Sequence, residues 1–203
     1  MHKISRQNGE AIMDDQVKNA ILNAAMRLFQ RFGYKKTTIE EIARAAQIGK
    51  GTVYLHFASK EEIFMTLVQN HLQEITEEWI KIVSKKWPPD KKVSAMLRSC
   101  ISTTQRKKEE LSLATLPTHL VQSVIEIAES SREQRLALLS TVLDPLFATG
   151  EDRSRAESRN KLAEVLLEQA NNILFRLDMD KNFCWEKFLD ASLELLLPTS
   201  EKE

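Results

Sequence analysis

Apolar side chains recur every three or four residues in one segment after another of this 203-residue chain, and that is the period of an amphipathic α-helix. The first such stripe predicts a helix over residues 14–32. One of two aspartates at its start can accept hydrogen bonds from the first free amides, and Gly33 can take the left-handed turn that ends it. Residues 1–13 show no such period, so we expect a flexible N-terminal arm there.

Two short helices are expected next, joined by a tight turn. The first is opened by Thr38 and Glu41, which form a Thr-x-x-Glu capping box, and its apolar positions have the i, i+3, i+4, i+7 spacing. After a turn at residues 47–49, a third helix is expected from about Lys50 to Phe57. Three short helices of which the last two are joined by a tight turn form a helix-turn-helix.

The rest of the chain is also predicted to be helical. A second capping box, Ser59 to Glu62, opens a long fourth helix whose apolar stripe continues until Pro88-Pro89. Only 5 Gly and 5 Pro occur in the chain, which argues against a turn-rich β protein. We therefore expect an all-α fold of about nine helices, with a small three-helix domain at residues 14–60 and a helical bundle at residues 61–203.

Charge divides the chain in the same place. Residues 1–60 carry 10 Lys and Arg against 5 Asp and Glu, whereas residues 61–203 carry 19 against 24. The basic N-terminal part and the acidic remainder suggest that residues 1–60 bind a polyanion. The first residues lack the apolar core of a secretory signal, and no apolar run approaches the length of a membrane span. We therefore expect a cytoplasmic protein with no membrane partner.

The expected third helix has an outward face suited to DNA. At 100° per residue, Val53 and Phe57 share the inward side, while Gly51, Thr52 and Leu55 point away from it. Lys50 can reach a base edge or a phosphate, and Gly51 lets the backbone approach a groove closely. Hydroxyl, imidazole and ammonium donors complete the predicted DNA-binding set, which is Thr38, Lys50, Gly51, Thr52, Tyr54, His56 and Lys60. In this set, Lys60 is predicted to be a phosphate contact at the start of the fourth helix.

Residues 14–62 resemble the DNA-binding domain of the TetR family of transcriptional regulators. The segments that carry the resemblance are Thr37-Thr38-Ile39-Glu40-Glu41-Ile42-Ala43, Ile48-Gly49-Lys50-Gly51-Thr52-Val53-Tyr54-Leu55-His56-Phe57 and Ser59-Lys60-Glu61-Glu62. Two positions depart from the family pattern. Gln47 stands where glycine is frequent, so a left-handed turn there would cost about 1 kcal/mol. Gly49 replaces the usual serine and is a weaker helix cap.

The resemblance implies a repressor that, as a homodimer, binds a palindromic double-stranded operator and leaves it when a small effector binds. It implies dimerisation through the last two helices, whose stripes offer Leu162, Leu166, Ile173, Leu177, Phe188 and Leu195. The same stripes could instead face the chain's own core. An effector pocket is expected inside the bundle, with His71, Trp79, Met96, Cys100, His119 and Phe175 as candidate lining residues. Such a lining would suit a hydrophobic or aromatic effector.

Other classes of function find less support in the sequence. No metal-ligand cluster, nucleophile motif or acid-base constellation is present, so we expect neither an enzyme nor a cofactor. A helical adaptor that binds a protein partner and has no DNA affinity is the alternative. Cys100 and Cys184 lie 84 positions apart and are expected to be separate reduced thiols rather than a redox pair.

Overall fold

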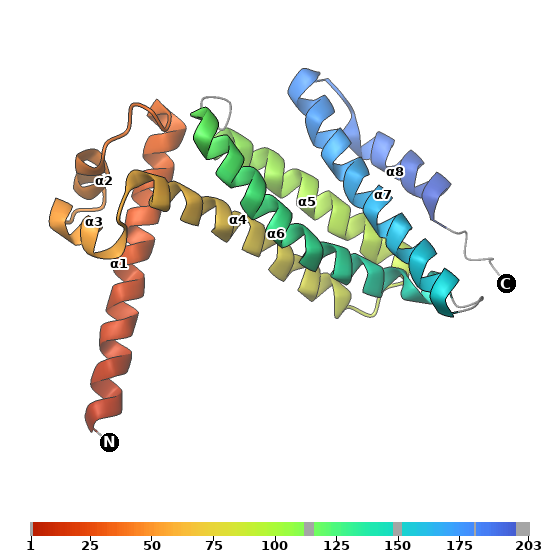
Figure 1. The fold of residues 1–203 in the computed structure, drawn as a ribbon, viewed down its shortest axis with the longest axis horizontal. Coiled ribbons are helices and arrows are strands. Elements are labelled where there is room, and N and C mark those ends of the chain that lie inside the picture. Colours follow the sequence, from red (N-terminus) through yellow and green to blue (C-terminus); the bar gives the residue numbers. More distant parts are fainter. Residues whose placement is uncertain (1, 112–115, 148–151, 181, 198–203) are drawn as a thin grey trace. The chain divides into compact units, whose positions relative to one another are not determined.

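The computed structural model describes residues 2–111, 116–147, 152–180 and 182–197, and these ranges are helical throughout apart from short connections. They contain eight α-helices and a short 3-10 helix, η2, and no strand (Figure 1). The expected all-α fold is confirmed, with eight α-helices in the described ranges instead of about nine. The bounds are α1 His2–Phe32, α2 Ile39–Ala45, α3 Lys50–His56, α4 Lys60–Val83, α5 Pro89–Leu111, α6 Thr118–Leu143, η2 Asp144–Phe147, α7 Asp152–Met179 and α8 Trp185–Leu196.

The start of α1 differs from the expectation. Its backbone is helical from His2 rather than from about Asp14, so the arm predicted for residues 1–13 is wrong as a statement about secondary structure. Hydrophobic periodicity reports that one face of a helix is buried. It does not detect helical backbone in a segment whose sequence lacks an apolar stripe.

The chain divides into two compact units. The first contains residues 1–70 and 107–127, and the second contains residues 71–106 and 128–203. The predicted boundary after residue 60 therefore lies ten residues before the end of the first unit's long segment. Helices α4, α5 and α6 each contribute residues to both units.

An aromatic cluster forms the centre of the first unit. Phe29 of α1, Tyr34 of the following loop and Phe64 of α4 meet with ring centroids 5.3–5.8 Å apart. Ile42 of α2 and Val53 of α3 are fully buried in the same unit. Tilted and edge-to-face ring contacts of this kind add to the stabilisation from burial alone. This packing holds α1, α2 and α3 together as one small domain.

The second unit has an aliphatic core with one buried tryptophan. Trp79 of α4 is fully buried, and its indole N–H donates to the carbonyl of Met96 in α5 at 2.8 Å. A buried indole N–H needs such an acceptor. Helices α6, α7 and α8 supply most of the remaining core, including Leu139, Leu166 and Leu189. α7 packs against α8.

Candidate DNA-binding surface

Both capping boxes of the helix-turn-helix region have formed. The Thr38 hydroxyl accepts from the Glu41 amide while the Glu41 carboxylate accepts from the Thr38 amide, which fixes the start of α2. At α4 the Ser59 hydroxyl accepts from the Glu62 amide, and the Glu62 carboxylate reaches back to the Ala58 amide, one residue earlier than in the usual box. These bonds satisfy amides that a helix start leaves free.

The turn between α2 and α3 has the geometry that the sequence indicated. Gln47 lies in the left-handed region with φ 60°, and Gly33, at the end of α1, does so with φ 81°. Gly49 caps α3 without a side-chain hydrogen bond. The left-handed conformation of Gln47 in this turn costs about 1 kcal/mol relative to glycine.

The outward face of α3 is open and carries few polar groups. Val53 and Phe57 are buried as expected, while Tyr54 is 49% exposed and Leu55 is 84% exposed. A Cβ atom added to Gly51 would meet nothing within 4 Å. Thr52, on the edge of this face, is half-buried. The backbone of α3 can therefore come close to a flat or grooved partner.

Lys50 is exposed but already has an acidic neighbour. Its ammonium forms an ion pair with the Glu40 carboxylate of α2 and lies 5.9 Å from the centre of the Tyr54 ring. This hydrogen bond lowers the pKa of Glu40 and raises that of Lys50. Both side chains are about half exposed, so a phosphate or a base edge can replace Glu40 at little cost. Glu40 cannot be identified as this partner from the sequence, because nothing local links it to a lysine ten positions away.

Lys60 lies in a different environment from the one predicted. Its ammonium donates to the carbonyls of Tyr34 and Thr37 at 2.8 and 2.7 Å and lies 4.3 Å from the centre of the Tyr34 ring. Burial lowers the pKa of Lys60, and the Glu41 carboxylate opposes that change. Lys60 therefore ties the loop between α1 and α2 to the start of α4.

His56 is also engaged within the protein. Its Nδ1 lies 3.2 Å from an Asp14 carboxylate oxygen, and its side chain is only 11% exposed. The same carboxylate group pairs with Lys18, one turn further along α1, and the hydrogen bond from Lys18 lowers the pKa of Asp14. His56 thus joins the end of α3 to α1. Asp14, expected to cap a helix, instead lies within one.

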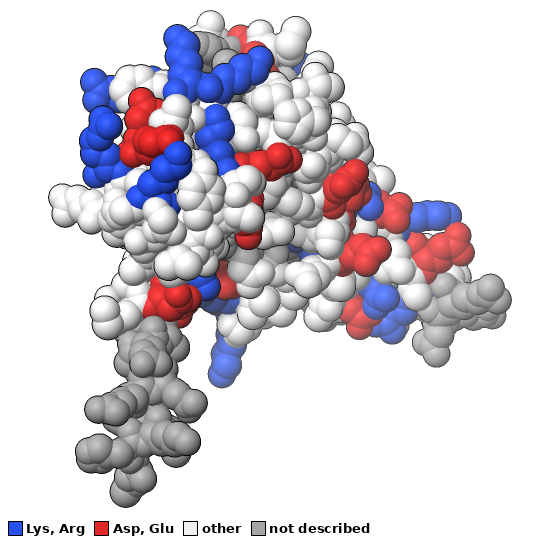
Figure 2. Space-filling model, turned by 60° about the vertical axis from the view of Figure 1, so that its left-hand side comes forward, with Lys and Arg blue, Asp and Glu red and all other residues white. Residues whose placement is uncertain are grey.

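Further exposed Lys and Arg side chains lie on the same three-helix domain as Lys50, His56 and Lys60. Figure 2, in which the side that bears α1–α3 comes forward, shows Lys and Arg side chains gathered on this face with some acidic side chains among them. Among the side chains that the structure describes, the exposed basic residues of α1–α3 and the connecting loop are Arg27, Arg31, Lys35, Lys36, Arg44 and Lys50. Clustered cations beside an open helix are the electrostatic signature of a nucleic-acid interface.

The six predicted effector residues do not share one environment. Trp79, Met96 and Cys100 belong to the core of the second unit, where His71 is also buried. His119 is exposed and belongs to the first unit, and Phe175 is 65% exposed. That these residues bind an effector stays a prediction. Apolar or aromatic type alone cannot tell a core position from a pocket wall.

The predicted dimer residues divide in a similar way. Leu166 and Ile173 are fully buried in the chain's own core, so they are not available for a seam between subunits. Leu162, Leu177 and Phe188 are partly buried against the same core. Only Leu195, at 87% exposure, projects into solvent.

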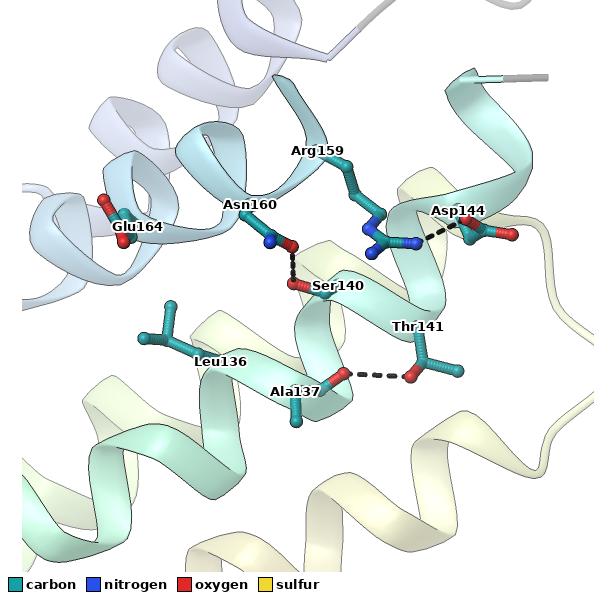
Figure 3. Close-up of a pocket in the computed structure, with 8 residues that line it drawn as sticks. All are labelled: Leu136, Ala137, Ser140, Thr141, Asp144, Arg159, Asn160 and Glu164. Carbon is teal, nitrogen blue, oxygen red and sulfur yellow. Dashed lines mark hydrogen bonds and ion pairs between the residues drawn. The ribbon is translucent and has the colours of Figure 1, made fainter. Parts of the chain in front are cut away.

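A hollow lies between α6 and α7 in the second unit (Figure 3). Its volume is about 650 Å³, and it is lined by Leu136, Ala137, Ser140, Thr141, Asp144, Arg159, Asn160 and Glu164. At one end the Asp144 carboxylate accepts from Arg155 at 3.2 Å and from Arg159 at 2.6 Å. The charged side chains around the hollow are two acidic ones, Asp144 and Glu164, and two basic ones, Arg155 and Arg159. Neither sign of charge dominates, so the hollow does not favour a charged ligand of either sign.

Within the described ranges, no three His, Cys, Asp or Glu side chains gather in a way that could hold a metal ion. The helices of those ranges also include none whose length and hydropathy would let it cross a membrane.

A three-helix domain whose short third helix is open to solvent, with exposed cations around it, is typical of a helix-turn-helix DNA-binding protein. Residues 21–67 match the family model described as bacterial regulatory proteins, tetR family. Residues 21–67 therefore carry the DNA-binding domain of the TetR family of transcriptional regulators, in agreement with the resemblance found in the sequence.

Individual relatives extend the comparison beyond this domain. The HTH-type transcriptional regulator YhgD of Bacillus subtilis is 33% identical over 120 residues, which are 56% of this chain and 62% of YhgD. The match thus spans less than two thirds of that relative. The HTH-type transcriptional repressor KstR2 of Mycobacterium tuberculosis is 27% identical over 175 residues, covering 86% of this chain and 77% of KstR2.

A solved structure shows the same fold. FadR from Bacillus subtilis in complex with stearoyl-CoA superimposes with a TM-score of 0.63 at 20% identity, covering 88% of this chain and 96% of FadR. At that identity the likeness concerns the fold alone.

Proposed function

We propose that the protein is a transcriptional repressor that binds a palindromic double-stranded operator as a homodimer and is released by a small-molecule effector. The observation that carries the proposal is the open outward face of α3, which combines Lys50, the unobstructed Gly51 and the half-exposed Tyr54 on a basic domain. A helix of this kind fits the major groove of B-DNA. A DNA-bound regulator of this family would act in the cytoplasm, and the proposal assigns it no catalysed reaction.

The proposed DNA contacts differ in their tasks. Lys50 and Tyr54 are placed to reach base edges or phosphates after Lys50 leaves Glu40, and Thr52 and Thr38 offer hydroxyl groups at the edges of the same face. Because Gly51 has no side chain, the backbone of α3 can come close to the DNA at this position. His56 and Lys60 support the geometry, because both are bound to other parts of the first unit.

A homodimer is proposed because one seven-residue helix offers too few contacts for specific binding, and two helices one DNA turn apart can read a palindrome. The apolar side chains that α7 and α8 leave exposed support this arrangement. They are Val165, Phe175, Met179 and Leu195, and the three on α7 lie within one helical stripe at spacings of ten and four residues. Leu195 also belongs to the seam predicted from the sequence, whereas Leu166 and Ile173 of that seam are fully buried.

The proposed dimer can be tested by sedimentation velocity. Phe175→Glu places a charge in the proposed interface and should shift the protein towards monomer, whereas Ile80→Glu, at another exposed apolar position of the second unit, should not. A variant Phe175→Glu that sediments like the parent protein would refute the assignment of this face.

The effector is proposed to be hydrophobic or aromatic and to bind the second unit, whose core is aliphatic. The name of the KstR2 relative describes a repressor, and the FadR structure contains an acyl-CoA, which gives that ligand class as a first probe. Because α4, α5 and α6 contribute to both units, a change in their packing can pass along continuous helices to the DNA-binding domain. A thermal-shift screen in which only polyanions without an apolar chain or ring stabilise the protein would contradict this effector class.

The DNA-binding proposal is tested by selecting duplexes from a randomised library and measuring their dissociation constants by fluorescence anisotropy. We expect an enriched palindrome bound at least a thousandfold more tightly than unrelated DNA. Tyr54→Ala should weaken binding to that palindrome, while Ile80→Ala, at an exposed position of the second unit, should not. Equal affinity for all duplexes would contradict sequence-specific recognition, and no affinity for DNA would favour the adaptor alternative.

A further inference from the structure

The proposed contacts leave one prominent side chain of α3 without a task. Leu55 is 84% exposed, although the other aliphatic residue of this helix, Val53, is fully buried. An isolated exposed leucine is common on protein surfaces. This one lies on the helix whose outward face we propose enters the groove, so its chemistry bears on what that face can recognise.

Two rows of side chains make up the outward face. Lys50 and Tyr54 are four residues apart and form one row, in which the ammonium lies 5.9 Å from the ring centre. Gly51 and Leu55, also four residues apart, form the second row. A Cβ atom at Gly51 would meet nothing within 4 Å. The second row is therefore a low, open surface that ends in an apolar side chain.

Leucine has no hydrogen-bonding group, so it can neither hold a phosphate nor pair with the polar edge of a base. The major groove presents one apolar group, the C5-methyl of thymine. Exposed cations on the same domain, among them Arg44 and Lys50, favour an anionic partner over an apolar protein surface. DNA is the partner that offers a negative backbone and an apolar group within one groove.

We infer that Leu55 is a specificity-determining residue that packs against the C5-methyl group of a thymine in each half of the operator. This inference rests on the proposed function, since it requires that α3 bind in the major groove. It adds a prediction about sequence, because one position in each half-site should be thymine for a reason independent of hydrogen bonding.

Deoxyuridine provides a direct test, because it differs from thymidine only by the missing methyl group. The duplex selected with the full-length parent protein is remade with deoxyuridine at each thymine in turn, symmetrically in both halves, and titrated by anisotropy. Loss of one buried methyl group corresponds to about a fourfold weaker binding per half-site, and to about fifteenfold for two independent halves. We expect this loss at one symmetric pair of positions.

The same series is measured with Leu55→Ala, Leu55→Val and the control Ile80→Ala, which changes an exposed apolar residue of the second unit. Leu55→Ala should bind the thymine duplex more weakly and respond to deoxyuridine less than twofold at the sensitive position. Leu55→Val should give an intermediate response, and Ile80→Ala should behave like the parent protein. Because Leu55 is exposed, circular dichroism should show the folded state in each variant.

The outcomes separate the inference from the proposed function. If the parent protein binds its selected duplex specifically but no deoxyuridine substitution weakens binding, the inference about Leu55 is overturned while the proposed function stands. If Leu55→Ala retains the full response to deoxyuridine, another residue reads the methyl group and the inference is again overturned. If no duplex is enriched at all, the proposed function itself fails.

Discussion

Replacing Lys60 by methionine separates a structural role of this residue from a role in binding phosphate. Methionine retains most of the aliphatic stem but removes the ammonium. The structure gives that ammonium two charge-assisted hydrogen bonds, to the carbonyls of Tyr34 and Thr37, and a position 4.3 Å from the centre of the Tyr34 ring. Without it, both backbone carbonyls lose a charged donor.

The expected cost follows from these contacts. A hydrogen bond to a charged group contributes about 1.5–3 kcal/mol, and a cation–π contact about 0.5–1 kcal/mol at an exposed site. Water can reach a half-buried site and replace part of this, and removal of the ammonium also ends its desolvation cost. We therefore expect Lys60→Met to lower the free energy of unfolding by about 2 kcal/mol, or the melting temperature by about 4–8 °C.

Urea denaturation measures this loss, with Lys36→Met, an exposed lysine in the loop that Lys60 holds, as the control that should change stability by less than about 0.5 kcal/mol. Operator affinity is then measured over a range of salt concentrations. Since the Lys60 donors are engaged within the protein, the slope of log affinity against log salt should stay the same. A slope reduced by about 1.8, the value for one lost phosphate contact in each subunit of the dimer, with unchanged stability would refute this reasoning and restore Lys60 to the DNA contacts.

Three further changes test other features. Glu40→Gln removes the carboxylate that holds Lys50, so it should tighten binding to operator and unrelated duplexes alike and steepen the salt slope by up to about two, since the dimer has two copies of Lys50; unchanged anisotropy titrations would contradict this. Gln47→Gly should raise the free energy of unfolding by up to about 1 kcal/mol because it relieves the left-handed backbone, whereas Gln47→Ala should not, and equal urea midpoints for the two would argue against strain. With a thiol reagent, the exposed Cys184 should react at once, while Cys100, whose pKa burial raises, should react only as the protein unfolds; equal rates for the two thiols would refute the burial of Cys100.

Local sequence signals predicted the helix-turn-helix well. Thr38 with Glu41 and Ser59 with Glu62 satisfy the free amides of their own helices, so both partners of each interaction lie within four residues. Gly33 and the left-handed Gln47 likewise depend on the backbone at a single position. Such signals need no knowledge of the remaining chain, which is why the order and approximate bounds of α2, α3 and α4 were predictable.

Polar partners that are distant in the sequence were not predictable. Lys60 and His56 have the residue types of DNA contacts, but folding brings them to Tyr34 and Asp14, which lie 26 and 42 positions earlier. Glu40 reaches Lys50 from a different helix. A donor on a helix surface can serve a phosphate or a neighbouring carbonyl equally well, and only the path of the chain determines which of them is near.

The helical class, the helix-turn-helix and the resemblance of the N-terminal domain to the TetR family could be predicted from the sequence, because periodicity, caps and turn residues act over a few positions. The tertiary structure alone decided which side of each apolar stripe is buried. It placed Leu166 and Ile173 inside the chain's own core and left Val165 and Phe175 outside, although both pairs lie on one helix and have similar hydrophobicity. Burial depends on how whole helices pack against one another, and helical spacing fixes only which residues share a face, not what that face will meet.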